Sequence, residues 1–289
     1  MSCVFRCETD LIHVSHFTFQ INIAFALPCF YFPLMKKLFL PVLFAVTLLV
    51  FPTACCHVRP VSTPAPALAG NPNMATNPVP RDPKWIKRHE GFVQEARKGG
   101  VDILFMGDSI TDGWRGRGTN VWNQFYAPRH AANFGISGDR TQHVLWRIDR
   151  GELEGIHPKV VVLMIGTNNT GKEDDHKTPR NTVPEVAEGV QAVVNDIRAR
   201  LPDSKILLLA IFPRGILDDP QRAQVALINT LIAKLDDGKM VRFLDIGPTF
   251  LEFDGTLPRS IMPDLLHPNA KGYRIWADAM EPALDEMMK

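Results

Sequence analysis

The sequence has 289 residues, a formal net charge of +1, 45% hydrophobic residues and 22% charged residues. These values are ordinary for a globular protein and exclude wholesale disorder. The near-neutral charge gives no support to nucleic acid or an anionic membrane as an obligate partner. All five cysteines precede His57. The later part of the chain therefore has no disulfide, cysteine nucleophile or zinc–cysteine site of its own.

Residues 35–56 predict a secretory signal. Two lysines follow Met35, an apolar run covers residues 38–51, and small residues come next. The run is shorter than the roughly 20 residues that a membrane span needs, and a permanently attached anchor is the alternative. Because such signals begin at the N-terminus, we infer that Met35 rather than Met1 is a candidate start. Residues 1–34 would then be a non-native extension.

Cys55 stands where a bacterial lipoprotein would carry its lipidated cysteine, although Pro52 occupies a place where leucine is usual. Lipidation at Cys55, and with it a membrane tether, is therefore one reading, and a cysteine that merely ends the apolar run is the other. We expect an exported protein: periplasmic, anchored to the outer membrane or extracellular in a bacterium. Residues 57–80 are rich in Pro, Ala, Asn and Thr and predict a linker. The folded domain is expected over 81–289.

The folded part alternates apolar segments with amphipathic ones, which favours an α/β domain with a parallel sheet covered on both faces. The predicted strands are residues 101–106, 131–136, 160–165, 205–211 and 241–246. The predicted helices are residues 85–96, a segment through 144–148, residues 184–201, residues 221–235 and a segment starting near 270.

The first strand ends in Gly107-Asp108-Ser109, which places a hydroxyl at the carboxyl edge of the sheet. Ser109 is a candidate nucleophile, and a capping serine at an ordinary strand-to-helix turn is the alternative. Residues 113–118 form a basic glycine-rich loop just beyond it. Asp108, Trp114 and Arg115 are candidates for substrate binding, although a solvated loop explains the pattern as well.

The second and third strands also end in residues suited to a site. Gly138 follows the second strand, where a positive φ angle or a backbone N–H aimed at the Ser109 edge would explain it. Asn168 follows the third strand and is either a turn former or a side-chain donor. Residues 166–172 also match the spacing of a phosphate-binding loop, but Glu173 stands where Ser or Thr should follow. Residues 173–176 could bind a cation, although a solvated loop is the simpler reading.

The last polar block before the C-terminal helix holds Asp264 and His267. An aspartate three residues before a histidine can hold the imidazole Nδ1–H and leave Nε2 free as a base. An acidic residue near a helix start is the alternative. Together, Ser109, His267 and Asp264 would supply a nucleophile, a base and its orienting carboxylate. The N–H groups of Ser109 and Gly138, with the Asn168 amide, would hold an oxyanion.

These four blocks, in order, resemble those of the SGNH (GDSL) hydrolases over residues 103–287. Within that family the segments 133–136, 143–147, 151–154 and 166–169 are similar to the catalytic subunits of type I platelet-activating-factor acetylhydrolase. The resemblance implies a flavodoxin-like three-layer α/β/α sandwich with a mostly parallel five-stranded sheet, a shallow site, and no metal or cofactor. The usual G-x-S-x-G elbow is excluded, because Thr111 replaces its second glycine.

Two departures from those subunits favour a different substrate. Residues 172–182 look like an insertion beside the site, and the chain carries an export signal. We therefore expect a serine esterase that removes short acyl groups, mainly acetyl, from carbohydrates or small esters through an acyl-enzyme. The alternatives are a lysophospholipase, a lipid esterase or a thioesterase with the same residues, and a non-catalytic glycan-binding module. The sequence does not determine the oligomeric state.

Overall fold

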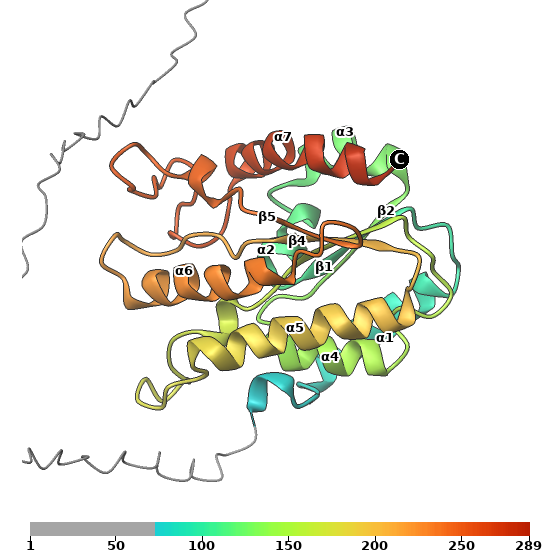
Figure 1. Cartoon of the computed structure of the whole chain (residues 1–289), viewed down its shortest axis with the longest axis horizontal. Coiled ribbons are helices and arrows are strands. Elements are labelled where there is room, and N and C mark those ends of the chain that lie inside the picture. The colour runs from blue at the N-terminus through green and yellow to red at the C-terminus, as the bar shows by residue number, and fades with distance from the viewer. Residues whose placement is uncertain (1–72) are drawn as a thin grey trace, which may run out of the picture. The chain divides into compact units, whose positions relative to one another are not determined.

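A sheet of five parallel strands forms the centre of the structure (Figure 1). In the computed structural model, which describes residues 73–289, the strands are β1 (Ile103–Gly107), β2 (Ala131–Gly135), β3 (Val160–Met164), β4 (Lys205–Leu209) and β5 (Val241–Leu244). Their order is β2-β1-β3-β4-β5, and every neighbouring pair is parallel. The predicted flavodoxin-like sheet is therefore confirmed. The order reverses between β1 and β3, and ligands of such sheets bind outside the carboxyl ends of the strands at that point.

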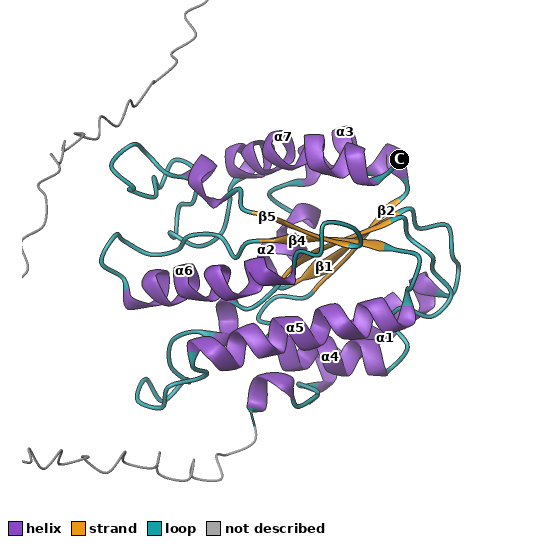
Figure 2. Ribbon diagram, viewed as in Figure 1, coloured by secondary structure: helices purple, strands orange, loops and turns teal. Residues whose placement is uncertain are grey.

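Helices cover both faces of the sheet and complete three layers (Figure 2). One face is covered by α1 (Pro83–Ala96), α4 (Thr141–Asp149), α5 (Val183–Arg200) and α6 (Pro220–Ile232), and the other by α3 (Thr119–Phe125) and α7 (Ala270–Met287). The short α2 (Ser109–Asp112) directly follows β1. The three-layer sandwich expected from the sequence is confirmed.

Each strand contributes to two hydrophobic cores, because successive side chains of a strand point to opposite faces. In β1, Leu104 and Met106 pack with the helices of the four-helix face. Ile103 and Phe105 pack with α3 and α7. All four side chains are fully buried. This two-sided burial explains why β1 and β3 are apolar throughout, with no alternation of polar residues.

Residues 73–80, which the sequence assigned to the linker, include a packed segment. A short 3-10 helix, Met74–Thr76, packs against α5, and Ala75 is completely buried. The Thr141 hydroxyl donates to the Ala75 carbonyl over 2.7 Å. The close approach depends on Gly189 of α5, where an added Cβ would lie 2.9 Å from the Ala75 carbonyl oxygen. The linker-like composition of these residues therefore did not indicate that they pack against α5.

The predicted extension 1–34, the signal 35–56 with Cys55, and the linker up to residue 72 lie outside the described residues. No helix within residues 73–289 combines the length and the apolar character that crossing a membrane requires. The predictions about export and lipidation therefore rest on the sequence.

Candidate active site

Ser109 lies at the carboxyl end of β1, where the strand turns into α2. Asp108 caps this helix, because its Oδ1 accepts a 2.9 Å hydrogen bond from the Ile110 N–H. Gly107 is required for space: an added Cβ would approach the Thr111 hydroxyl and the Met164 carbonyl to less than 3.0 Å. The glycine thus lets β1, β3 and α2 meet closely, which places the serine hydroxyl at the sheet edge.

His267 and Asp264 approach Ser109 from the segment before α7. The Ser109 Oγ lies 2.8 Å from His267 Nε2, and His267 Nδ1 lies 2.7 Å from Asp264 Oδ2. Asp264 Oδ1 also accepts the His267 backbone N–H at 2.8 Å. The sequence-predicted trio is therefore brought together in one chain of hydrogen bonds.

The carboxylate of Asp264 is held in its charged form. Partial burial acts to raise the pKa of Asp264, but hydrogen bonds from the backbone and side chain of His267 outweigh it and lower that pKa to about 2. A carboxylate that accepts from Nδ1 leaves Nε2 as the acceptor facing the serine hydroxyl. The arrangement can therefore move a proton away from Ser109 while the imidazolium that forms stays charge-balanced.

Gly138 and Asn168 lie together, as the sequence predicted, in the loops after β2 and β3. Gly138 has a φ of 82°, so the positive φ expected from its position is present. The Asn168 amide donates to the Asp139 carbonyl oxygen over 2.9 Å, which ties the two loops together. Both residues line a hollow of about 420 Å³. Ser137, which precedes Gly138, instead lines the hollow of about 510 Å³ that contains Ser109 and His267.

A buried charged network anchors the Gly138 loop from below. The carboxylate of Asp139 accepts from the indole Nε1 of Trp85 at 2.6 Å and lies 3.0 Å from Nε of Arg147. Arg81 reaches the same carboxylate at 3.2 Å and the Ser137 carbonyl at 2.7 Å. The side chains of Asp139 and Arg147 are completely buried. The network fixes the backbone on both sides of Gly138, and no sequence pattern identified its members as part of the site.

Trp114 does not contact the site, so the expectation that it binds substrate was wrong. Its side chain is 1% exposed and lies in the core between Tyr273 and Trp276, with ring centroids 4.5 and 4.9 Å away. The reason is that the 113–118 segment starts as a short 3-10 helix, Gly113–Arg115, whose apolar residue turns inward.

The two other candidates for substrate binding take different positions. Arg115 lines the hollow that contains Ser109 and His267. Its guanidinium also donates to the Asn133 carbonyl and lies 3.4 Å from Asp112. Asp108 is 1% exposed. Burial raises the pKa of Asp108 to about 7, with the nearby Asp139 carboxylate acting in the same direction. Asp108 therefore lies under the site as a helix cap.

The 172–182 segment lies beside the Gly138 hollow, where the sequence placed it. Arg180 donates to the Asn168 carbonyl at 3.0 Å, and Lys172 pairs with Pro179 in an antiparallel bridge. Glu173 accepts two hydrogen bonds from Arg140, at 2.7 and 2.6 Å. Within residues 73–289 no group of three or more His, Cys, Asp or Glu side chains is arranged to hold a metal ion. Glu173 of this acidic segment therefore forms an ion pair with Arg140 that holds the 172–182 segment against the start of α4.

Two residues near the site, Arg88 and His143, had no recognisable signal in the sequence. Arg88 of α1 lines the Ser109 hollow, as does Arg117 of the predicted basic loop, and His143 of α4 lines the Gly138 hollow. Burial and then the charges of three neighbouring arginines lower the pKa of His143 to about 3. Its Nδ1 accepts the Arg140 backbone N–H at 2.9 Å. His143 is therefore a neutral structural acceptor.

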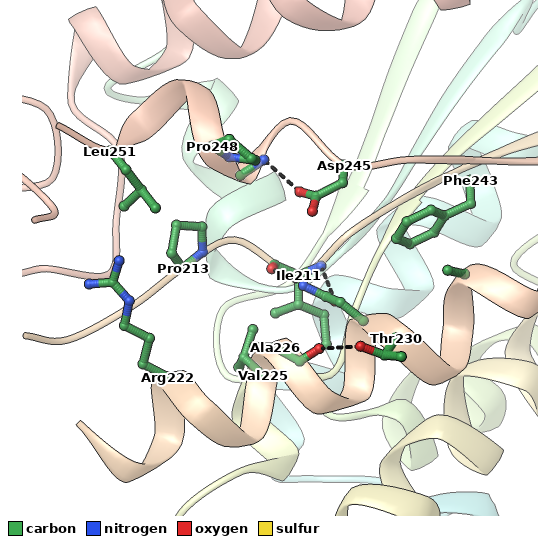
Figure 3. Close-up of a pocket in the computed structure, with 13 residues that line it drawn as sticks. Ile211, Pro213, Arg222, Val225, Ala226, Thr230, Phe243, Asp245, Pro248 and Leu251 are labelled. Atoms are coloured by element: carbon green, nitrogen blue, oxygen red, sulfur yellow. Dashed lines mark hydrogen bonds between the residues drawn. The ribbon is translucent and has the colours of Figure 1, made fainter. Parts of the chain in front are cut away.

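A separate hollow of about 370 Å³ lies between α6 and the segment after β5 (Figure 3). Two of its polar side chains have partners within it: Asp245 accepts from the Gly247 N–H at 2.8 Å, and Thr230 donates to the Ala226 carbonyl at 3.1 Å. Arg222 donates to the Gly255 carbonyl outside the hollow over 2.5 Å. None of its lining residues is shared with the hollows of Ser109 and Gly138. This hollow is therefore separate from the two that lie beside Ser109 and Gly138.

Comparison with known proteins agrees with this geometry. The GDSL-like Lipase/Acylhydrolase family matches residues 105–275. Platelet-activating factor acetylhydrolase IB subunit alpha1 of Bos taurus is 36% identical over 212 residues, which cover 71% of this chain and 87% of that protein.

Two solved structures share the fold. A GDSL-like lipase from Bacteroides thetaiotaomicron matches with a TM-score of 0.54 and 18% identity, over 68% of this chain and 97% of that chain. A catalytic mutant of Axe2, an acetylxylan esterase from Geobacillus stearothermophilus, matches with a TM-score of 0.52 and 22% identity, over 65% and 94%. The predicted resemblance is confirmed: the chain belongs to the GDSL-like lipase/acylhydrolase (SGNH) family and is a carboxylic ester hydrolase.

Proposed function

We propose that this protein is a serine esterase that removes short acyl groups, mainly acetyl, from carbohydrates. The observation that carries the proposal is the continuous hydrogen-bond chain from Ser109 Oγ through the His267 imidazole to Asp264, with contacts of 2.8 and 2.7 Å. A nucleophile, a base and an orienting carboxylate at hydrogen-bond distance are what acyl transfer requires.

In the proposed reaction, Ser109 Oγ attacks the ester carbonyl while His267 Nε2 takes its proton. The tetrahedral intermediate then collapses: the bond from the carbonyl carbon to the alcohol oxygen breaks, and His267 returns the proton to the leaving alcohol. Water, deprotonated by His267, attacks the acyl-enzyme, and the Ser109 oxygen leaves with that proton. Asp264 keeps the imidazole oriented and balances its charge in both halves.

The negative oxygen of each intermediate would be held by the N–H groups of Ser109 and Gly138 and by the amide of Asn168. One N–H of that amide already donates to the Asp139 carbonyl, so the amide is oriented before substrate arrives. Donors that need no reorganisation at the moment of reaction stabilise developing charge most strongly. The Asp139 network supports this arrangement, because it fixes the loop that carries Gly138.

The polarity of the site favours a short acyl group and a polar alcohol. The hollow around Ser109 and His267 is lined by glycines, Ser137 and the charged side chains of Arg88, Asp112, Arg115 and Arg117. A long acyl chain would need an apolar groove, because about 0.8 kcal/mol per CH₂ is lost when a chain stays in water. The similarity in fold to an acetylxylan esterase agrees with a sugar ester.

A lipid ester is the second candidate, favoured by the relatives. The bovine relative, at 36% identity, is named a platelet-activating factor acetylhydrolase subunit. Both readings use the same residues, and both begin with an acetyl ester. Rates on acetylated xylo-oligosaccharides, on acetyl glycerolipids and on octanoyl esters separate them, and we expect the acetylated sugar to be the best substrate.

The experiment that tests the chemistry is Ser109→Ala, assayed with p-nitrophenyl acetate. We expect a loss of at least about 10³-fold in kcat, since the nucleophile of a serine triad acts with its base as a unit. Ser260→Ala is the matched control, because Ser260 is exposed and outside both hollows. An organophosphonate should label the wild-type protein once, at Ser109. Full activity in folded Ser109→Ala would overturn the mechanism, and sugar binding without turnover would favour the glycan-binding module.

We also propose that residues 35–56 direct export and that Cys55 carries a lipid. This rests on the sequence alone. Mass spectrometry of the protein from a bacterial host distinguishes the outcomes: a lipid-modified Cys55 at the N-terminus supports the tether, while cleavage at another site leaves an untethered exported protein.

A further inference from the structure

The hollow that contains Ser109 and His267 holds an excess of positive charge. Three guanidinium groups line it, from Arg88, Arg115 and Arg117, and a single carboxylate, Asp112, faces them. The whole chain carries a formal net charge of only +1, so the charge is concentrated at this place. Because like charges in a confined hollow repel one another, such a concentration stabilises a bound anion more than a neutral ligand.

The single carboxylate is already fully engaged. The Asp112 carboxylate accepts hydrogen bonds from both terminal nitrogens of Arg88, one of them over 3.0 Å. Its Oδ1 also lies 3.4 Å from Nη1 of Arg115. Both guanidinium groups also lie over the Phe92 ring, at 5.7 and 5.1 Å from its centroid, which limits their movement. Burial and then the charge of Arg88 lower the pKa of Arg115, which agrees with two cations held close together.

Arg117 is the arginine of this hollow that has no hydrogen bond or ion pair within residues 73–289. It is exposed and stands between Gly116 and Gly118. An exposed guanidinium has its planar set of donors available, and carboxylates and phosphates match that set with two parallel hydrogen bonds.

The hollow on the other side of the Ser137–Gly138 turn lacks such an excess. Its arginines have carboxylate partners: Arg140 pairs with Glu173 at 2.6 Å, and Arg81 pairs with Asp139 at 3.2 Å. Arg180 lies 3.4 Å from Glu173 and 3.5 Å from Asp174. The uncompensated charge therefore lies on one side of the nucleophile, the side formed by α1 and the 113–118 segment.

We propose that the natural substrate is an acyl ester that carries an anionic group, a carboxylate or a phosphate, close to the ester, and that Arg117 binds this group together with Arg115 and Arg88. The proposal rests on the proposed esterase function and names its substrate class. The anion would lie in the Ser109 hollow while the acyl carbonyl faces Gly138 and Asn168. A neutral acetylated sugar would be hydrolysed at the same serine but would lack this contact.

The test compares three esters that differ in one group: an acetylated methyl glucoside, the corresponding glucuronide and the corresponding 6-phosphate. With the full-length protein at low salt, we expect kcat/KM for an anionic ester to exceed that of the neutral one by about 10-fold, through KM. The ratio should shrink in 0.5 M NaCl, since salt screens an exposed contact. Preference for the glucuronide identifies a carboxylate, and preference for the 6-phosphate identifies a phosphate.

The variant Arg117→Gln should lower the anionic-to-neutral ratio about 10-fold. Arg97→Gln is the matched control: Arg97 is exposed at the end of α1, has no ion pair within the described part of the chain, and lies outside the hollow. We expect it to keep the wild-type ratio. Equal wild-type rates on all three esters at low salt, or an Arg117→Gln variant with an unchanged ratio, would overturn the anionic substrate.

The proposed esterase function can fail separately, and it does so if neither p-nitrophenyl acetate nor any of the three esters is hydrolysed. In that event calorimetric titration of Ser109→Ala with glucuronate and with inorganic phosphate still decides the anion site. The anion site is supported if Ser109→Ala binds one of these anions and the double variant with Arg117→Gln binds it about 10-fold more weakly. The anion site is overturned if neither anion binds at millimolar concentration.

Discussion

The hydroxyl of Tyr273 donates a 2.7 Å hydrogen bond to the carbonyl oxygen of Ile110. Ile110 follows Ser109 in α2, and Tyr273 lies in the first turn of α7, shortly after His267. The bond therefore joins the two segments that carry the proposed nucleophile and base, which are 158 residues apart in the chain. The Tyr273 side chain reaches α2 because Gly113 and Gly118 leave room for its ring and hydroxyl.

Removing this hydroxyl should loosen the site. We expect Tyr273→Phe to lower the free energy of unfolding by about 1 kcal/mol, or more if the Ile110 carbonyl stays buried and unpaired. We also expect kcat on p-nitrophenyl acetate to fall several-fold. The variant lacks the hydrogen bond that joins the Ser109 segment to the His267 segment, so the distance between the two side chains becomes more variable. Urea denaturation and initial rates measure the two effects.

Tyr126→Phe is the matched control. Tyr126 is fully buried in the same aromatic cluster, 5.2 Å from Trp114, and within residues 73–289 its hydroxyl makes no hydrogen bond to the Ser109 segment. Its kcat should stay near that of the wild type. A kcat that falls equally in both variants would mean that the cluster, and not the Tyr273–Ile110 bond, positions the serine.

Much of the fold could be predicted because its determinants are local. The apolar runs that form β1 and β3 are buried on both faces, and their uninterrupted apolar composition predicts this burial. The position of these site residues could also be predicted. Ser109, Gly138 and Asn168 each follow a strand, and parallel strands bring their carboxyl ends to one edge of the sheet.

What the sequence did not reveal depends on contacts between distant segments. Trp114 reads as part of a polar loop, and only α7 packing against it makes it a core residue. Ala75 reads as linker, and only the space above Gly189 makes it part of the fold. Arg88 looks like any exposed helix arginine until α1 is placed beside α2. No local pattern in the sequence encodes these pairings.

The indole of Trp85 donates to the carboxylate of Asp139, in the loop that carries Gly138. We expect Trp85→Phe to lower the free energy of unfolding by about 2–4 kcal/mol, because it removes both apolar contact and a hydrogen bond to a buried carboxylate. We also expect kcat to fall about 10-fold, because the Asp139 loop that carries Gly138 loses its 2.6 Å contact.

The control for this variant is Trp146→Phe. Trp146 lies in the same aromatic cluster, 5.2 Å from Trp85, and its indole makes no hydrogen bond within residues 73–289. Chemical denaturation should register some loss of stability, while steady-state kinetics should register little change in kcat. If Trp85→Phe loses stability but keeps its kcat, the network supports the fold without positioning Gly138.

Gly107 and Gly91 make a pair with opposite expectations. Gly107→Ala should abolish soluble folded protein, because its Cβ would collide with the Met164 backbone as well as with Thr111. Gly91→Ala, inside α1 with nothing within 4 Å of its new Cβ, should raise the free energy of unfolding by about 0.5–1 kcal/mol. Expression yield and thermal unfolding decide both. A stable, fully active Gly107→Ala protein would show that β1, β3 and α2 are less tightly packed than described.

Asp108 is the buried carboxylate next to the proposed nucleophile. Burial first, and then the nearby Asp139 carboxylate, raise the pKa of Asp108 from 3.8 to about 7, against the hydrogen bond from Ile110 and the charge of Arg214. Between pH 4 and pH 7 the folded protein therefore keeps a proton that the unfolded chain has released. The stability that this proton provides is complete below about pH 4 and is lost as the pH rises through about 7.

Asp108→Asn removes this dependence on pH while its side-chain oxygen can still cap α2. We expect the free energy of unfolding of the variant to exceed that of the wild type at pH 8, by at most about 4 kcal/mol, and the gap to be about 2.5 kcal/mol smaller at pH 5. Urea titrations of both proteins at pH 5, 6, 7 and 8 measure the gap directly. Asp108→Ala lacks the cap and should lie about 1 kcal/mol below Asp108→Asn at every pH. A gap between wild type and Asp108→Asn that stays constant from pH 5 to pH 8 would show that Asp108 is already ionised throughout that range, and that its charge is compensated inside the fold.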